Sequence, residues 1–390
     1  MAGSLASHGI VVVAPEHRDG SGPRTYIGGP KGRPVDYRAI SHVQSKEVED
    51  ARDEQLRIRL WELGLLHNAL VKIDNGERLS NVLSKDHKGD FPMFASSLDV
   101  HTPGKISWAG HSFGAATVVQ FVKSVFYHSA SMSPSNRALF KPAVDSSIVG
   151  QITPSSTVGL FDLWALPLRS ASTHWLWTKP FPCYSPTGPG GANLLAVLSE
   201  AFFKWRGNLI SVKQAMTENP LRDHPSGPKT HSPPYMFYPA TSAHLSQSDF
   251  GVLFPWLTKK TMKAEEPERT IRLNVRAMLE VLRQNGTEVA DTSATDMEEV
   301  PEHRTKFTLN GHALGNGHAH HAKLDNPSYK SQDQKILAAD GSIRGWVALN
   351  PYSEDRPGEA VNEKTKADAD PMDAVVQGEV LGDGMVRGEA

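Results

Sequence analysis

The sequence predicts an α/β fold, with a mostly parallel β-sheet and helices on both of its faces. Three observations support this prediction. Strand-like and helix-like segments alternate across residues 1–286, an order typical of parallel strands joined by crossover helices. The strand-like segments are continuous apolar runs, as in strands that are buried on both faces. A glycine-flanked serine separates one such strand from the helix that follows it.

The first quarter of the chain predicts one strand and one long helix. Residues 5–9 have the pattern of a helix end that a glycine closes. Residues 10–14 (IVVVA) are mostly β-branched, which predicts a buried parallel strand. Residues 15–34 are rich in glycine and proline and are predicted to form a loop. From 43 to 70, apolar residues recur at helical spacing among charged ones, which indicates a long amphipathic helix.

The remaining elements follow from the same patterns. A strand followed at once by a helix is predicted over 105–127, and another buried strand over 156–161. Residues 193–205 carry an aromatic face and are predicted to form a helix. Residues 235–238 (YMFY) predict a short strand, and 270–284 a helix that a glycine ends.

The composition changes after about residue 286, where apolar residues become sparse. Such a segment cannot bury enough apolar surface to fold. We therefore expect one catalytic domain over 1–286 and a low-complexity, largely disordered tail over 287–390, with 343–349 as a late apolar patch. A histidine cluster in this tail lacks cysteine and acidic ligands at ordered spacing, so no metal site is predicted there. Its members are His312, His318, His320 and His321.

The overall composition limits the function and the compartment. A formal net charge of −2 over 390 residues gives no basic surface of the kind that nucleic acid requires, so no nucleic-acid partner is expected. Cys183 is the single cysteine, which excludes an internal disulfide. The sequence has no run of about 18 apolar residues and no signal-type N-terminus. We therefore expect a cytoplasmic protein.

Residues 110–114 (GHSFG) form the most informative motif. The pattern G-x-S-x-G between a strand and a helix is typical of a nucleophile elbow, a sharp turn that exposes a serine hydroxyl at the end of a sheet. Gly110 and Gly114 are both expected to be required, because a side chain at either position would collide with the neighbouring strand and helix. The side chain of His111 is expected to point away from the nucleophile. The motif indicates a serine hydrolase with Ser112 as its nucleophile.

A serine hydroxyl needs a base within hydrogen-bonding reach and an acid that orients this base. In α/β hydrolases the acid and then the histidine follow the serine in the chain, each just past the end of a strand. Asp162 and His244 both meet this requirement. On chain order alone, His174, His224 and His231 also follow Asp162. An aspartate after a strand is, moreover, often only a turn residue or a helix cap.

Four blocks of sequence resemble the plasma and intracellular type II platelet-activating factor acetylhydrolases. They are 5–20 (LASHGIVVVAPEHRDG), 110–117 (GHSFGAAT), 161–168 (FDLWALPL) and 244–250 (HLSQSDF). The blocks occur in the order found in the family, and the resemblance extends over about residues 3–285.

This resemblance implies an α/β-hydrolase fold and a serine esterase that needs no metal and no cofactor. It implies that Ser112 is the nucleophile, His244 the general base and Asp162 the acid that orients it. The backbone N–H of Phe113 would stabilise the oxyanion. The implied substrate is the short sn-2 acyl ester of platelet-activating factor or of oxidised phospholipids, with transient contact to a lipid surface.

One departure from the family pattern is expected to matter. In the family, a strand and a glycine-rich turn precede the segment that here begins at Met1, and that turn supplies a second oxyanion donor. The resemblance thus implies an N-terminally incomplete sheet and a weaker oxyanion hole, and losing one donor typically costs about 10²–10³ in rate. Two alternatives stay open: a general carboxylesterase or lipase that acts on other esters, and a truncated, inactive hydrolase fold.

Aromatic residues are frequent between 164 and 205. We interpret them mainly as core packing and lid structure, because aromatic side chains bury large apolar areas. An acyl-binding wall or a surface that touches lipid is the alternative interpretation.

Overall fold

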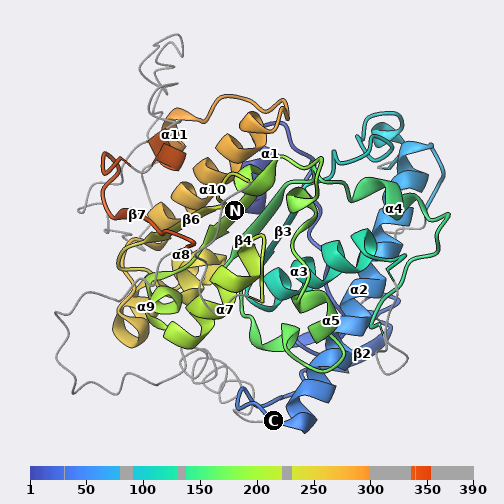
Figure 1. Cartoon of the computed structure of the whole chain (residues 1–390), viewed down its shortest axis with the longest axis horizontal. Helices are drawn as coiled ribbons and strands as arrows, with labels where there is room; N and C mark the ends of the chain where they lie inside the picture. The colour runs from blue at the N-terminus through green and yellow to red at the C-terminus, as the bar shows by residue number, and fades with distance from the viewer. Residues whose placement is uncertain are drawn as a thin grey trace.

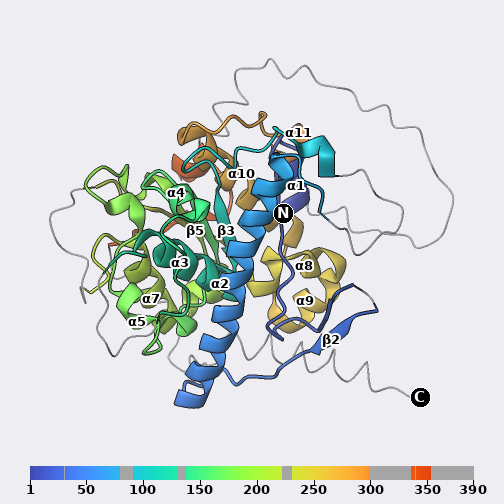
Figure 2. The same cartoon turned by 90° about the vertical axis from the view of Figure 1, so that its right-hand side faces the viewer.

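A computed structural model describes residues 1–29, 31–79, 91–130, 138–221, 231–297, 335–338 and 340–352. A five-stranded sheet runs through the centre of this part of the chain, and helices pack on both of its faces (Figure 1). The long helix α2 (Lys46–Asp74) lies across one side of the molecule (Figure 2). The predicted α/β fold is confirmed.

The strands lie in the sheet in the same order as in the chain. The first four pair in parallel, and the last pairs antiparallel to its neighbour. Because the first four strands are parallel, their carboxyl ends meet at one edge, where the loops that follow them come together. The strands are β3 (Trp108–His111), β4 (Val158–Phe161), β5 (Leu194–Val197), β6 (Tyr235–Pro239) and β7 (Trp346–Ala348).

Alternate residues of the central strands face opposite helical layers, as the period of two in a strand requires. In β5, Leu194 and Ala196 pack in the core that contains α2 and α3 (Phe113–Phe126). Leu195 and Val197 pack instead with α10 (Pro267–Gln284) on the other face. All four residues of β5 are therefore buried, and β4 divides between the two layers in the same way.

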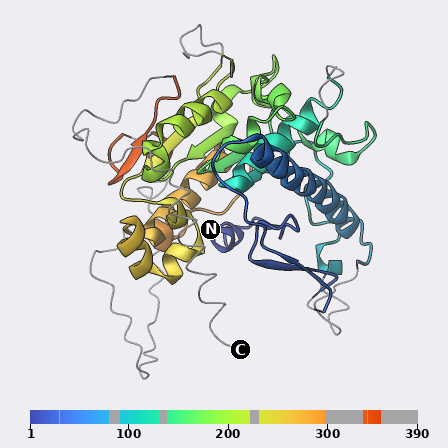
Figure 3. The same ribbon diagram turned by 90° about the horizontal axis from the view of Figure 1, so that it is seen from below.

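Of the predicted helices, α2, α3 and α10 are confirmed, and each places an apolar side against the sheet. Figure 3 shows the sheet between the layer of α2 and the layer that contains α8 (Asp249–Leu253) and α9 (Pro255–Met262). The shorter helices are α1 (Ala2–Ala6), α4 (Ser147–Gln151), α5 (His174–Trp177), α6 (Glu200–Lys204), α7 (Arg206–Met216), α8 (Asp249–Leu253), α9 (Pro255–Met262) and α11 (Ala294–Met297). Five 3₁₀ turns are also described: η1 (Phe91–Phe94), η2 (Leu166–Leu168), η3 (Pro182–Tyr184), η4 (Gly190–Asn193) and η5 (His244–Gln247).

The prediction of a helix over 193–205 is wrong in its first half. Leu194–Val197 forms β5, which pairs with β4 on one side and β6 on the other, and only Glu200–Lys204 is helical. A short apolar run has no periodicity that separates a buried strand from a buried helix, so the neighbouring strands decide its conformation. The sheet also extends past residue 286, since β7 comes from the segment assigned to the tail.

The strand predicted over residues 10–14 does not form. This segment belongs to no sheet, and Val11 and Val13 are 54% and 41% exposed. A strand needs a hydrogen-bonded neighbour, and in the described part of the chain β3 pairs only with β4. Within the predicted loop of 15–34, β1 (Arg24–Ile27) instead pairs with β2 (Arg33–Asp36) in a separate antiparallel hairpin.

None of the helices in the described ranges combines the length and the apolar character that crossing a bilayer requires.

Candidate active site

Ser112 lies in the sharp turn that the motif predicts, between the last residue of β3 and the first residue of α3. Its backbone has φ 56° and ψ −121°, a conformation that side chains disfavour. Gly110 is required by packing, because a Cβ atom there would lie 2.3 Å from the carbonyl oxygen of Gly114. Gly114 itself is not required in this way, since a Cβ there would meet no atom within 4 Å. The expectation for the second glycine is therefore wrong.

Asp162 follows β4 directly, as predicted, and its side chain is completely buried. Its backbone also has a positive φ, of 45°. Two hydrogen bonds hold it against the end of β5: its own N–H donates to the Val197 carbonyl, and the Ser199 N–H donates to its carboxylate. These bonds fix the direction in which the second carboxylate oxygen points.

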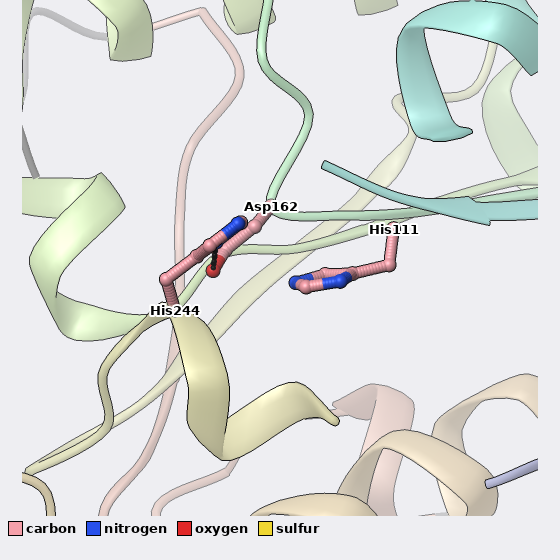
Figure 4. A group of neighbouring side chains, drawn as sticks. All are labelled: His111, Asp162 and His244. Atoms are coloured by element: carbon pink, nitrogen blue, oxygen red, sulfur yellow. Dashed lines mark hydrogen bonds and ion pairs between the residues drawn. The ribbon is translucent and has the colours of Figure 1, made fainter. Parts of the chain in front are cut away.

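That second oxygen contacts His244, the first residue of η5, which follows β6. Nδ1 of His244 lies 2.8 Å from Oδ2 of Asp162 (Figure 4). With the carboxylate ionised, this hydrogen bond requires the proton on Nδ1, which leaves Nε2 able to accept a proton. The sequence-predicted acid and histidine, 82 residues apart, are thus brought together.

Burial sets the protonation of this pair. His244 is 5% exposed, and its burial lowers its pKa, so the ring stays neutral at pH 7. Burial raises the pKa of the Asp162 carboxyl, while the hydrogen bond from the Ser199 N–H opposes that rise. A neutral imidazole beside a hydrogen-bonded carboxyl group is the resting form that a general base needs.

Ser112 does not contact this pair through a hydrogen bond. Among the residues that the structure describes, its hydroxyl makes no hydrogen bond with His244. Hydrogen bonds of catalytic groups are often long before a substrate binds and shorten in the complex. The structure therefore gives the orienting acid and the histidine in contact, and the serine at the adjacent strand end.

His111, the residue before the predicted nucleophile, contacts the histidine of the candidate site. Its ring stacks on the ring of His244, with centroids 4.4 Å apart and planes inclined by 30° (Figure 4). The prediction that this side chain points away from Ser112 did not include a contact with His244. As the last residue of β3, His111 lies opposite Phe161 in the ladder, and its neighbour across the strand end is therefore the Asp162 turn.

The cluster of His111, Asp162 and His244 also has the residue types of a metal site, with ligand atoms within 4.8 Å of one another. Tetrahedral Zn²⁺ with ligands at about 2.0–2.1 Å separates them by about 3.3 Å. The 2.8 Å between His244 and Asp162 is shorter than this and fits a hydrogen bond. The histidine cluster of the tail, residues 312–321, lies outside the described residues.

Phe113 begins α3, so its backbone N–H has no acceptor within the helix and is available to an oxyanion. Its side chain contacts two guanidinium groups of α2. The Cζ atoms of Arg59 and Arg52 lie 4.1 Å and 5.5 Å from the centre of its ring. These cation–π contacts attach the start of α3 to α2 and fix the position of the elbow.

The competing histidines lie elsewhere. His231 bonds to Glu218 at 2.8 Å, His174 begins α5, and His224 lies outside the described residues. Phe202 of α6 was missed as a site residue: its ring stacks on His244 with centroids 4.6 Å apart. No local sequence signal marks this role, because it depends on which strand ends meet.

The aromatic residues between 164 and 205 are mainly core residues, as we interpreted them. Trp164, Phe181 and Phe202 are at most 1% exposed and belong to the main hydrophobic cluster. None of the exposed large apolar side chains of the described chain lies between residues 164 and 205.

A serine in an elbow after one parallel strand, with an acid and a histidine after later strands, is the arrangement of an α/β hydrolase. Residues 1–177 match the family described as platelet-activating factor acetylhydrolase, isoform II. This match includes the elbow and Asp162 and confirms the resemblance inferred from the motifs.

Individual proteins show the same similarity. The chain is 26% identical over 314 residues to a putative phospholipase A2 of Schizosaccharomyces pombe, which covers 74% of this chain and 64% of that protein. It is 37% identical over 121 residues to the platelet-activating factor acetylhydrolase of Canis lupus familiaris, and 38% over 122 residues to that of Cavia porcellus. Each of these two matches covers 30% of this chain and 26% of the relative. The chain thus spans less than two thirds of the length of these curated relatives.

Proposed function

We propose that this protein is a serine esterase that hydrolyses the short sn-2 acyl ester of platelet-activating factor-like or oxidised phospholipids. The observation that carries the proposal is the buried hydrogen bond between Asp162 and His244 beside the Ser112 elbow. The similarity to platelet-activating factor acetylhydrolases supports the choice of substrate class.

In the proposed first step, the Ser112 hydroxyl attacks the acyl carbonyl while Nε2 of His244 takes its proton. Asp162 holds the ring through Nδ1 and stabilises the imidazolium that forms. The Phe113 N–H donates to the oxyanion of the tetrahedral intermediate. When this intermediate collapses, His244 returns the proton to the leaving glycerol oxygen, and the lysophospholipid departs.

The second step removes the acyl group from Ser112. Water attacks the acyl-enzyme, His244 takes the proton of that water, and the same N–H donates to the new oxyanion. Collapse releases the short carboxylic acid and restores the Ser112 hydroxyl. The histidine thus acts twice as base and twice as acid, which requires a ring that is neutral at rest.

The test compares the full chain with Ser112→Ala in two measurements: labelling by a fluorophosphonate probe and hydrolysis of a 2-acetyl phospholipid. We expect labelling of the parent only, and a loss of at least about 10³-fold in hydrolysis by the variant. A neutral acetate ester without a phospholipid head group serves as the competing substrate. Faster turnover of that ester would favour a general carboxylesterase. Equal hydrolysis rates for the parent and Ser112→Ala would contradict the proposal that this protein is a serine esterase.

We also propose that the protein touches the lipid surface through α8 and α9. Leu253, Phe254 and Trp256 are 68%, 44% and 67% exposed and follow one another around the junction of these helices. Exposed lysines flank them: Lys259, Lys260 and Lys263. Apolar side chains bordered by cations are the pattern of segments that lie in the interface of an anionic membrane.

A further inference from the structure

Two aromatic rings stack on the ring of His244. His111 stacks at 4.4 Å between ring centroids, and Phe202 stacks at 4.6 Å with an interplanar angle of 11°. The three rings come from the end of β3, the turn η5 and the helix α6. Asp162 contacts the edge of the middle ring at Nδ1.

Each contact restricts a different motion. A single hydrogen bond at Nδ1 holds one point of the imidazole and leaves the ring able to rotate about that bond. Two stacked rings restrict this rotation, because turning the imidazole out of its plane would drive it into its neighbours. Stacked aromatic pairs add stabilisation beyond their buried area, which is enough to favour one orientation several-fold.

His111 is suited to this position by its electrical neutrality. It is half-buried and has its pKa lowered to about 3, first by desolvation and then by the charge of His244, with Asp162 and the His244 backbone opposing. Its Nε2 makes no hydrogen bond to any residue that the structure describes. Besides a hydrogen bond with the His244 backbone, His111 offers His244 the face of a neutral ring, which can also lie against an imidazolium without repelling it.

We propose that His111 is a positioning residue for His244, and that its ring, with that of Phe202, fixes the plane in which Nε2 is presented to Ser112. The proposal rests on the proposed function in one respect, that His244 is the base. His111 touches neither the ester nor the serine proton in this scheme. It acts only through the ring that it packs against.

The test compares His111→Phe, which keeps a ring face, with His111→Gln, which removes it. Acetyl-ester hydrolysis by the full chain should show kcat within about 3-fold of the parent for the phenylalanine variant and about 10–100-fold lower for the glutamine variant, with KM unchanged in both. The acid limb of the kcat profile should move towards higher pH in the glutamine variant, because a less enclosed His244 regains an ordinary pKa. His128→Gln, at the far end of α3, is the matched control.

A second readout separates this proposal from the proposed function. The Nδ1–H proton of His244 and its titration are followed by NMR in the parent and in both variants, whether or not they hydrolyse esters. Loss or broadening of that resonance in His111→Gln but not in His111→Phe supports the positioning role, and identical spectra and titrations in all three overturn it. Equal damage by both variants also overturns it. His111→Ala replaces the glutamine variant if that protein does not fold. An inactive parent with the expected NMR differences would contradict only the proposed function.

Discussion

At the scale of single residues, the candidate site depends on backbone conformations that most side chains avoid. Ser112 and Asp162, at the ends of neighbouring strands, both have a positive φ. Such residues cost about 1–3 kcal/mol each and persist only where the surroundings determine them. Here the buried strand β4 and the contacts of Phe113 with α2 hold these two backbone conformations in place.

The two glycines of the elbow give a matched pair for a stability measurement. Gly110→Ala should lower the free energy of unfolding by about 1–3 kcal/mol or more, because its Cβ would collide with the Gly114 backbone. Gly114→Ala should change it by less than about 1 kcal/mol, since that position lies in α3 with open space around it. Urea unfolding of both variants checks this, and equal losses would contradict it.

The orientation of side chains was the part of the site that could not be predicted. Ser112, Asp162 and His244 were identified from chain order, strand ends and resemblance, because these are properties of the sequence. The stacking of His111 and Phe202 on His244 depends on how strand ends meet in the sheet. The spacing of residues along the chain does not predict the distances between these rings.

At the scale of elements, long periodic segments were predicted well and short apolar ones were not. The helix α10 has its apolar residues at helical spacing over 18 residues, so its prediction needed no neighbour. β5 has four consecutive buried residues and no period, so only its pairing with β4 and β6 defines it. Residues 10–14 have a strand-like composition, but they form no strand because no neighbouring strand pairs with them in the described part of the chain.

The helix α3, which follows the elbow, contains a buried lysine. Lys123 in its last turn is 1% exposed, and its Nζ has no hydrogen-bond partner among the described residues. Nζ lies 5.0 Å from the ring centre of Phe181. Burial lowers the pKa of this ammonium group to about 7, with the neighbouring Cys183 opposing the shift.

This burial predicts a pH-dependent stability. Between about pH 7 and 10.5 the unfolded chain holds a proton on Lys123 that the folded chain has lost, so stability rises with pH in that window. Lys123→Met should flatten the rise and add about 1–3 kcal/mol to the free energy of unfolding at pH 7. Chemical unfolding at several pH values measures this, with the exposed Lys105→Met as control. Parallel pH profiles for parent and Lys123→Met would refute it.

At the scale of the whole molecule, the turn that carries His244 leads directly into α8 and α9. The exposed apolar residues of these helices and the histidine of the candidate site are therefore close in the chain, and α8 packs against the turn η5 that carries His244. A protein attached to a lipid surface at α9 would hold its histidine turn near that surface.

Vesicle binding tests this arrangement. Trp256→Ser should lower the partition constant for phosphatidylcholine–phosphatidylserine vesicles by at least about 10-fold, because burying a large apolar side chain contributes about 1.5–3 kcal/mol. Trp61→Ser is the control, since Trp61 is 55% exposed but lies on α2. Co-sedimentation gives the bound fraction, and an equal decrease for both variants would show that α9 is not the contact.

The position of β3 in the sheet has a further consequence. Within the described chain β3 is paired only with β4, and Ala109 in its middle is exposed. A strand bonded on one side can separate from the sheet by small local openings, at a free energy well below that of global unfolding. Amide hydrogens of β3 should then exchange with solvent faster than those of β4. Local opening of this edge strand would then set the fraction of time for which Ser112 is held in place. The melting temperature, which reports global unfolding, would not detect that fraction.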